Sequence, residues 1–154
     1  MFNQILLWSF LILPWLVLFF LKKHKVKRYF PGGLFGALIL TVIFQIAEKY
    51  HWWIIEENIP ILTNVTTFVY GSFLVGTIII LYFTFGNFIK YLVTNLIIDS
   101  LLSFGISKWY EHLNIYKLVN INSFGVYIVT TVVAILIYFY QIWQDKLYSQ
   151  NQKG

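Results

Sequence analysis

Long runs of apolar residues, separated by short polar segments, dominate the pattern along this chain. The runs are continuous and do not alternate apolar with polar positions, so they predict helices that are apolar on all sides. About 20 such residues, at ~1.5 Å each, cross the ~30 Å hydrocarbon core of a bilayer. The predicted transmembrane helices cover residues 5–21, 31–47, 61–85, 88–106 and 124–143.

The predicted fold is therefore an all-α, polytopic bundle of about five transmembrane helices, formed by a single membrane domain over residues 1–154. A β-barrel is excluded because its strands need only ~10 residues and alternate in hydrophobicity. Pro14 predicts a kink in the first helix, and Pro31 is suited to the first turn of the second. Gly86 and Asn87 predict a tight turn between the third and fourth helices.

Residues 107–118 are amphipathic and lie between the fourth and fifth runs. Trp109, Leu113 and Tyr116 follow one another at intervals of four and three residues, which places them on one face of a helix. This pattern predicts an interfacial helix over residues 107–118. A longer fourth helix is the alternative.

The composition supports a lipid environment. Of all residues 59% are hydrophobic and 11% are charged, whereas a soluble domain has about 25% charged residues. Too few polar side chains are available to cover a water-facing surface. The chain has no cysteine, which excludes disulfides, thiolate metal sites and cysteine nucleophiles.

The lysine and arginine residues predict the orientation in the membrane, because cytoplasmic loops carry an excess of both. One short basic run holds five of them: Lys22, Lys23, Lys25, Lys27 and Arg28. With that run inside, eight basic residues are cytoplasmic and three are outside. The other inside residues are Lys90, Lys146 and Lys153, and the outside ones are Lys49, Lys108 and Lys117. The N-terminus is then outside and the C-terminus is cytoplasmic.

The basic run could serve as a topology anchor or as a site for nucleic acid or a particular anionic lipid. No aromatic residue interrupts it between Lys22 and Arg28, as a stacking platform for single strands would require. We expect a topology anchor and no nucleic-acid partner. A secretory signal is not expected, because the basic residues follow the first apolar run and do not precede it.

A polar stripe crosses the fourth predicted helix. Asn95, Asp99 and Ser103 recur every four residues, so they share one helix face, which should point into the bundle. A carboxylate near the middle of a membrane helix costs about 2.5 to 3.5 kcal/mol on insertion scales. Asp99 therefore indicates either a functional site or a hydrogen-bonded seam between helices.

The predicted topology places further polar residues in the outer half of the membrane. The full set is Gln45, Glu48, Asn64, Asp99, Ser103, Asn120 and Asn122. These residues could line an outward-opening cavity for a ligand, ion or proton. In the alternative, asparagine, threonine and serine make hydrogen bonds between helices around a protonated acid, and no ligand is needed.

Metal binding is not expected. Glu48 and His51 form Glu-x-x-His, a pair whose spacing suits a metal in helical bundles, but the motif occurs once. No spacing brings further ligands to it. We therefore expect a solvated interfacial loop, no metal and no cofactor.

Small residues predict sites of close helix packing. Gly32 and Gly36 form a GxxxG pair, and Ser72 and Gly76 form a second pair with the same spacing. Such pairs let two helix backbones approach each other. Packing within one chain is expected, and packing between two copies is the alternative.

Several segments resemble a known family. They are residues 15–36 with the basic run and Arg-Tyr-Phe-Pro, 84–88, 92–99 and 115–119. In these segments the chain resembles an uncharacterised family of small polytopic membrane proteins from Gram-positive, often spore-forming, bacteria. The resemblance implies location and architecture, and that family has no assigned activity.

The predicted function is that of a non-enzymatic structural or interaction component of the bacterial plasma membrane. Membrane lipids are the expected partners, with a second copy or other membrane proteins left open. The alternative is a small transporter, channel or ligand sensor that uses Asp99, Asn95, Ser103, Asn64 and Glu48. A third hypothesis, an intramembrane enzyme, would use Asp99, or Glu48 with His51, as acid and base.

Overall fold

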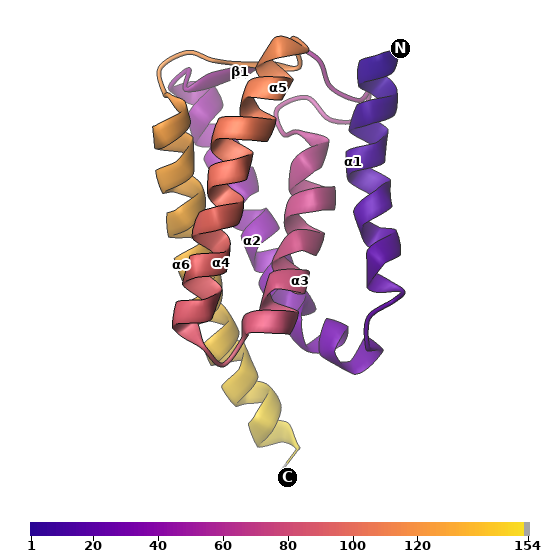
Figure 1. The fold of residues 1–154 in the computed structure, drawn as a ribbon, viewed down its shortest axis with the longest axis vertical. Helices are drawn as coiled ribbons and strands as arrows, with labels where there is room; N and C mark the ends of the chain where they lie inside the picture. Colours follow the sequence, from indigo (N-terminus) through magenta and orange to yellow (C-terminus); the bar gives the residue numbers. More distant parts are fainter. Residues whose placement is uncertain (153–154) are drawn as a thin grey trace.

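The computed structural model describes residues 1–152, which form an up-and-down bundle of helices (Figure 1). The helical elements are α1 (Phe2–Leu18), α2 (Lys23–Lys49), η1 (Val69–Phe73), α3 (Leu74–Thr84), α4 (Phe88–Leu101), η2 (Leu102–Ile106), α5 (Ser107–His112) and α6 (Ser123–Asn151). The π-helical turns η1 and η2 continue into α3 and join α4 to α5, so residues 1–152 contain five helical rods. The predicted all-α architecture is confirmed.

Three of the rods are long and apolar enough to cross a membrane. They are α2, the continuous helix Phe88–His112, and α6. The other two, Phe2–Leu18 and Val69–Thr84, are shorter apolar helices, and at ~1.5 Å per residue each is about 25 Å long. These lengths and compositions are compatible with an integral membrane protein.

The second helix begins earlier than Pro31, where we predicted its start. It begins at Lys23, so the basic run forms its first turns and Pro31 lies inside it. Proline lacks an N–H and crowds the preceding turn, which normally kinks a helix. Gln141 of α6 donates to the carbonyl of Arg28 at 3.2 Å, so a neighbouring helix provides an additional donor close to the proline.

The third helix begins later than predicted, because residues 61–66 form a loop. The side-chain amide of Asn58 donates to the carbonyl of Val65 at 2.8 Å, and its oxygen accepts from the N–H of Ile59. The local side-chain bonds of Asn58 offer the backbone an alternative to helix in this segment. The Gly86 turn between α3 and α4 is present as predicted, with a positive φ of 97° at Gly86.

The predicted interfacial helix over residues 107–118 is wrong, and the alternative of a longer fourth helix is correct. The fourth rod continues to His112, and Asn114 then takes a left-handed conformation with φ 55°. Strand β2 (Tyr116–Leu118) follows and pairs antiparallel with β1 (Trp53–Ile55). This pairing joins segments far apart in sequence, so a local period of apolar residues could not predict it. The two strands cap the upper end of the bundle, where the N-terminus lies (Figure 1).

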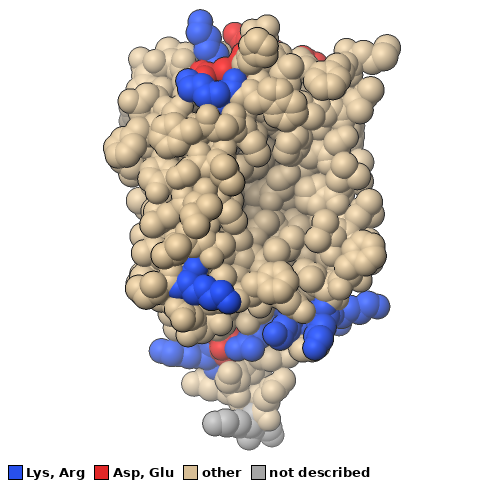
Figure 2. Space-filling view, viewed as in Figure 1, with Lys and Arg blue, Asp and Glu red and all other residues tan. Residues whose placement is uncertain are grey.

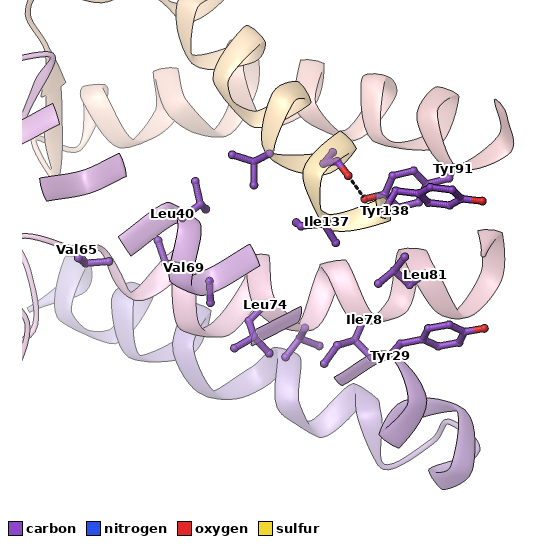
Figure 3. Packing of buried hydrophobic residues seen from close by; sticks show 14 residues of the cluster. Tyr29, Leu40, Val65, Val69, Leu74, Ile78, Leu81, Tyr91, Ile137 and Tyr138 are labelled. Atoms are coloured by element: carbon purple, nitrogen blue, oxygen red, sulfur yellow. Dashed lines mark hydrogen bonds between the residues drawn. The ribbon is translucent and has the colours of Figure 1, made fainter. Parts of the chain in front are cut away.

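Apolar side chains from α2, α3, α4 and α6 fill the centre of the bundle. Ile78 and Leu81 of α3 and Ile137 of α6 are almost fully buried in one cluster (Figure 3). Within the same cluster, the Tyr91 hydroxyl of α4 donates to the carbonyl of Ala134 at 2.7 Å. The tyrosine thus contributes both its ring and its polar group to the contact between α4 and α6.

The outer surface of the bundle is apolar along its middle. Leu38, Leu101 and Phe139 lie on three different helices and are each at least 60% exposed. Figure 2 shows an uncharged belt between two ends that carry the charges. Soluble monomers rarely expose an apolar area of this extent, so the surface fits contact with lipid.

The basic residues are sorted between the two ends as the alternation of helices predicts. Lys22 to Arg28, Lys90 and Lys146 lie toward the lower end, and Lys49, Lys108 and Lys117 lie toward the upper end. Figure 2 shows blue side chains at both ends, with more of them below. Lys153 lies outside the described residues.

Candidate functional site

The polar stripe of the fourth rod faces the bundle interior, as its four-residue spacing predicts. Asn95, Asp99 and Ser103 are all buried, with 7%, 4% and 0% of each residue exposed. They lie on the side of the rod that contacts α6, because Thr131 of α6 reaches Asp99. Asp99 is near the middle of the continuous helix Phe88–His112.

The partners of the stripe are few and local. Asn95 donates to the carbonyl of Tyr91 one turn earlier at 2.8 Å. The Thr131 hydroxyl is 3.5 Å from Asp99 Oδ2 and 2.9 Å from the carbonyl of Tyr127. The Ser103 hydroxyl has no hydrogen-bond partner within the part of the chain that the structure describes. The stripe is therefore buried with few hydrogen bonds, of which, among residues 1–152, only that of Thr131 to Asp99 joins α4 to α6.

The structure does not gather the other predicted polar residues around Asp99. Glu48 is exposed at the last turn of α2, and Asn64 is half-buried in the 61–66 loop. Asn120 donates to the carbonyl of Tyr50, and Asn122 caps the start of α6. Only the three residues of the α4 stripe share one face.

The GxxxG pair packs inside the chain. A Cβ atom at Gly36 would lie 2.6 Å from Ile137 Cδ1 of α6, and one at Gly32 would lie 2.6 Å from Gln141 Oε1. The positions of both glycines are thus occupied closely by α6. The intramolecular alternative for Gly32 and Gly36 is confirmed.

The second small-residue pair, Ser72 and Gly76, does not bring two helix backbones together at both of its positions. A Cβ atom at Gly76 would meet nothing within 4 Å, so the expected packing of Gly76 within the chain is wrong, and packing between two copies stays a prediction. Ser72 does contact α1, because its hydroxyl donates to the carbonyl of Phe10 at 3.2 Å. The close approach is at Gly71, where a Cβ atom would lie 2.6 Å from Leu11 Cα. The spacing of Ser72 and Gly76 thus predicted a small-residue contact at Gly76, whereas the backbone of α1 approaches at Gly71.

The basic run is mostly solvent-facing. Lys22, Lys23 and Lys27 are exposed, Lys25 lies over the ring of Tyr82 at 5.0 Å, and Arg28 binds the carboxylate of Asp145 through two hydrogen bonds. One residue of the five thus pairs with an acid, and the rest leave a dense positive charge at the lower end (Figure 2).

A polar contact that the sequence did not reveal ties α1 to the upper loop. Asn3 donates to one oxygen of Glu57 at 2.6 Å, and Gln4 donates to the other at 3.0 Å. These hydrogen bonds, first that of Asn3 and then that of Gln4, hold the pKa of Glu57 below its usual value of 4.5. The contact fixes the N-terminal end of α1 against the cap.

A pocket of about 110 Å³ lies below the β1–β2 cap, at a place that no pattern in the sequence indicated. Its walls come from α2, the η2 region, α6 and the segment before α3. The lining residues are Leu40, Phe44, Trp53, Thr66, Phe68, Leu102, Ile106, Ser107, Tyr110, Tyr116, Val126, Val129 and Thr130. Figure 2 shows the face hollowed in the corresponding upper half. The predicted polar cavity is thus replaced by an apolar pocket that none of the five predicted site residues lines.

Hydroxyl groups gather at the upper end of this pocket. Ser107 and Tyr116 are hydrogen-bonded to each other, and burial raises the pKa of the Tyr116 hydroxyl to about 12. The Tyr110 hydroxyl is buried and has no partner among residues 1–152. A buried hydroxyl without a partner is unfavourable, so the Tyr110 hydroxyl adds polarity but no hydrogen bond to this end of the described bundle. The lining contains no charged residue.

The residues that could bind a metal are not clustered. Across the described 152 residues, no group of three or more histidine, cysteine, aspartate and glutamate side chains could hold a metal ion. Glu48 and His51 are both exposed at the end of α2. The Glu-x-x-His spacing therefore finds no additional ligands in this part of the chain.

Comparisons of the chain with protein-family models, with curated proteins and with solved structures gave no match.

Proposed function

We propose that this protein is a multi-pass component of the bacterial plasma membrane, with a non-enzymatic structural or interaction role. All five rods cross the membrane in this proposal, with the N-terminus outside and the C-terminus in the cytoplasm. The observation that carries it is the uncharged belt between two charged ends (Figure 2). Such a surface suits lipid and would aggregate in water.

Helix lengths and interfacial residues agree with five crossings. The two shorter rods are about 25 Å long by their residue count, which a bilayer accommodates by slight thinning or by anchoring flanking residues. Trp52 and Trp109 lie near the upper end, and Trp143 lies toward the lower end. Aromatic residues of this kind are enriched at both membrane interfaces.

The buried polar groups favour the structural role over a transport path. Tyr91, Asn95 and Thr131 each bond to a backbone carbonyl within the bundle. Gly32 and Gly36 bring α2 against α6 with no space between them. Asn95 and Thr131 bond within their own helices and Tyr91 bonds across to α6, so these groups are satisfied without a ligand. Membrane lipids are the proposed partners, together with a second copy or other membrane proteins.

The topology can be tested with single cysteines, because the chain has none of its own. Lys117→Cys in β2 and Lys25→Cys in the first turn of α2 place one thiol at each end of the bundle. We expect a membrane-impermeant thiol reagent to label Lys117→Cys in intact cells and Lys25→Cys only after permeabilisation. The opposite labelling would reverse the orientation, and recovery of both variants in the soluble fraction would contradict membrane insertion.

A second candidate function, binding of a proton or ligand at Asp99, is favoured by one observation. The Asp99 carboxylate has a single long hydrogen bond of 3.5 Å, and Ser103 beside it has none among the described residues. An intramembrane acid with so few partners is a functional candidate.

Asp99→Asn separates the two functions. For the structural role, the variant should keep the thermal transition and oligomeric state of the natural chain within error, because an amide also accepts from Thr131. Thr131→Val is the control, because it removes the hydrogen bond to Asp99 and keeps the carboxylate. Its thermal transition should change little, since one interhelical hydrogen bond is worth only about 0.6 kcal/mol in membranes. Loss of proton-linked flux in liposomes by a folded Asp99→Asn variant would instead support the site.

A further inference from the structure

We propose that the pocket below the β1–β2 cap binds one acyl chain of a membrane glycerophospholipid. The inference depends on the proposed membrane location of the bundle and adds a ligand class to it. The proposed site is the upper half of the bundle face that Figure 2 shows hollowed.

The lower part of the pocket suits a hydrocarbon chain. Leu40 of α2, Leu102 of η2 and Val129 of α6 converge there from three rods. At about 110 Å³ the pocket is smaller than the cavities of ~150 Å³ that hold a benzene ring. It therefore accommodates a few methylene groups of a chain whose remainder stays in the bilayer, and it is too small for a helix about 10 Å wide.

The upper part supplies the polar groups that a lipid needs near its ester. Tyr110 is two residues from the end of the fourth rod, close to the level at which the chain passes from hydrocarbon to headgroups. Its hydroxyl is buried without a partner in the described chain, and Ser107 and Tyr116 lie beside it on the pocket wall. The polar end of the pocket thus lies toward the headgroups and its apolar end toward the acyl chains.

The η2 turn is part of the same wall. Leu102 and Ile106 lie at its two ends and both line the pocket, while Ser103 between them faces the interior. A π-helical turn rotates the following residues relative to a regular helix, and such turns are frequent at functional sites. Here the rotation presents Ile106, Ser107 and Tyr110 to one cavity.

The chemistry of the lining argues against a water-soluble ligand. No charged side chain lines the pocket, so an anionic or cationic metabolite would lose its hydration without a counter-charge. Trp53 of β1 and Tyr116 of β2 lie across the upper side. The apolar surface of the bundle continues from the pocket, which makes the bilayer the source of the ligand.

Photocrosslinking in nanodiscs tests the site. The full chain is reconstituted in phosphatidylglycerol that contains a small share of the same lipid with a diazirine on one acyl chain, and crosslinked peptides are mapped by mass spectrometry. We expect crosslinks to concentrate on pocket residues such as Phe44, Leu102 and Val129. Val129→Phe should fill the pocket and lower these crosslinks at least about five-fold.

Val132→Phe is the matched control, because Val132 lies on the same helix, is half exposed and does not line the pocket. It should leave the crosslinks unchanged. The thermal transition of each variant verifies folding.

Two outcomes would overturn the lipid site while leaving the membrane location intact. Crosslinks spread evenly over exposed positions such as Leu38 and Phe139, with Val129→Phe and Val132→Phe indistinguishable, would indicate surrounding lipid only. If pocket residues take up no lipid crosslink and the protein is an oligomer, the pocket would be assigned to contact with a second chain. A chain that takes up no lipid crosslink anywhere would instead contradict the proposed membrane location itself.

Discussion

At Gly71 the backbone of the third rod lies directly against the backbone of α1, and Leu11 Cα is 2.6 Å from the place of a Cβ atom. Two hydrogen bonds accompany the contact. Trp15 Nε1 donates to the carbonyl of Tyr70 at 3.2 Å, and the Ser72 hydroxyl donates to the carbonyl of Phe10. Gly76, five residues later, has open space around it. Two glycines of one helix thus have opposite roles, and only one allows α1 to dock.

Gly71→Ala should separate α1 from the third rod, because the methyl group would meet backbone atoms, which cannot rotate away. We expect a loss of about 1–3 kcal/mol of stability, the usual penalty for overpacking. Thermal unfolding in detergent measures it. Gly76→Ala is the control and should be neutral or stabilising by up to ~1 kcal/mol, because alanine favours helix. Equal transitions for the two variants would contradict the assigned contact.

Among the elements, α1 depends most on contacts other than helix packing. Its N-terminal turn is held by Asn3 and Gln4 on the two oxygens of Glu57, and its middle by the η1 turn. The loop between α2 and α3 thereby connects the first rod to the cap. β1 of the same loop pairs with β2, so one segment joins the upper ends of several rods.

The Glu57 contact predicts a dependence on pH. Because the folded-state pKa of Glu57 is lowered, its stabilising contribution is complete well above pH 4.5 and is lost as the pH falls through the lowered value. Hydrogen exchange of the first α1 amides, corrected for intrinsic rates, should therefore be faster at pH 3 than at pH 7. Glu57→Gln should remove that difference, at a cost below ~1 kcal/mol because the loop is accessible to water.

Glu56→Gln provides the matched control for this measurement. Glu56 is the neighbouring residue, is exposed, and makes no side-chain hydrogen bond within residues 1–152. Its substitution should preserve the difference between the two pH values. An equal effect of both substitutions would show that general charge, and not the Asn3 and Gln4 contact, holds α1.

For the whole molecule, the dominant feature is the unequal charge of the two ends. The lower end carries the basic run, Lys90 and Lys146, and the upper end carries Lys49, Lys108 and Lys117 beside four glutamates. Acidic residues contribute little to orientation, whereas lysine and arginine resist translocation. The bundle is therefore expected to insert in one orientation only.

Replacing Lys22, Lys23, Lys25 and Lys27 together by glutamine should remove most of that bias. Only Arg28, Lys90, Lys146 and Lys153 then remain on the predicted cytoplasmic side, against three residues outside. We expect a mixed population, seen in intact cells as partial protection of a thiol at Asn120→Cys, an exposed upper position whose replacement removes no charge. Replacing Lys108 and Lys49 by glutamine increases the asymmetry and should leave a single orientation. A single orientation in both cases would show that the basic run does not set the topology.

The positions of the helices could largely be predicted from the sequence. The errors in their ends have a common cause. The apolar runs located all five rods, and the spacing of Asn95, Asp99 and Ser103 correctly placed them inside. The ends of the rods were less accurate. Residues 61–66 and the β2 segment leave the helix because of Asn58 and of a distant strand, and neither partner can be recognised from local periodicity.

What the sequence by itself determined is the number of rods, their alternating direction and the end at which each lysine and arginine of residues 1–152 lies. These properties follow from the length and hydrophobicity of continuous segments, which are local quantities. The tertiary structure alone decided that Gly71 contacts α1 while Gly76 does not, that β1 pairs with β2, and that an apolar pocket forms below them. Each of these depends on which surfaces of distant segments meet, and a side chain's type does not specify its neighbour across the bundle.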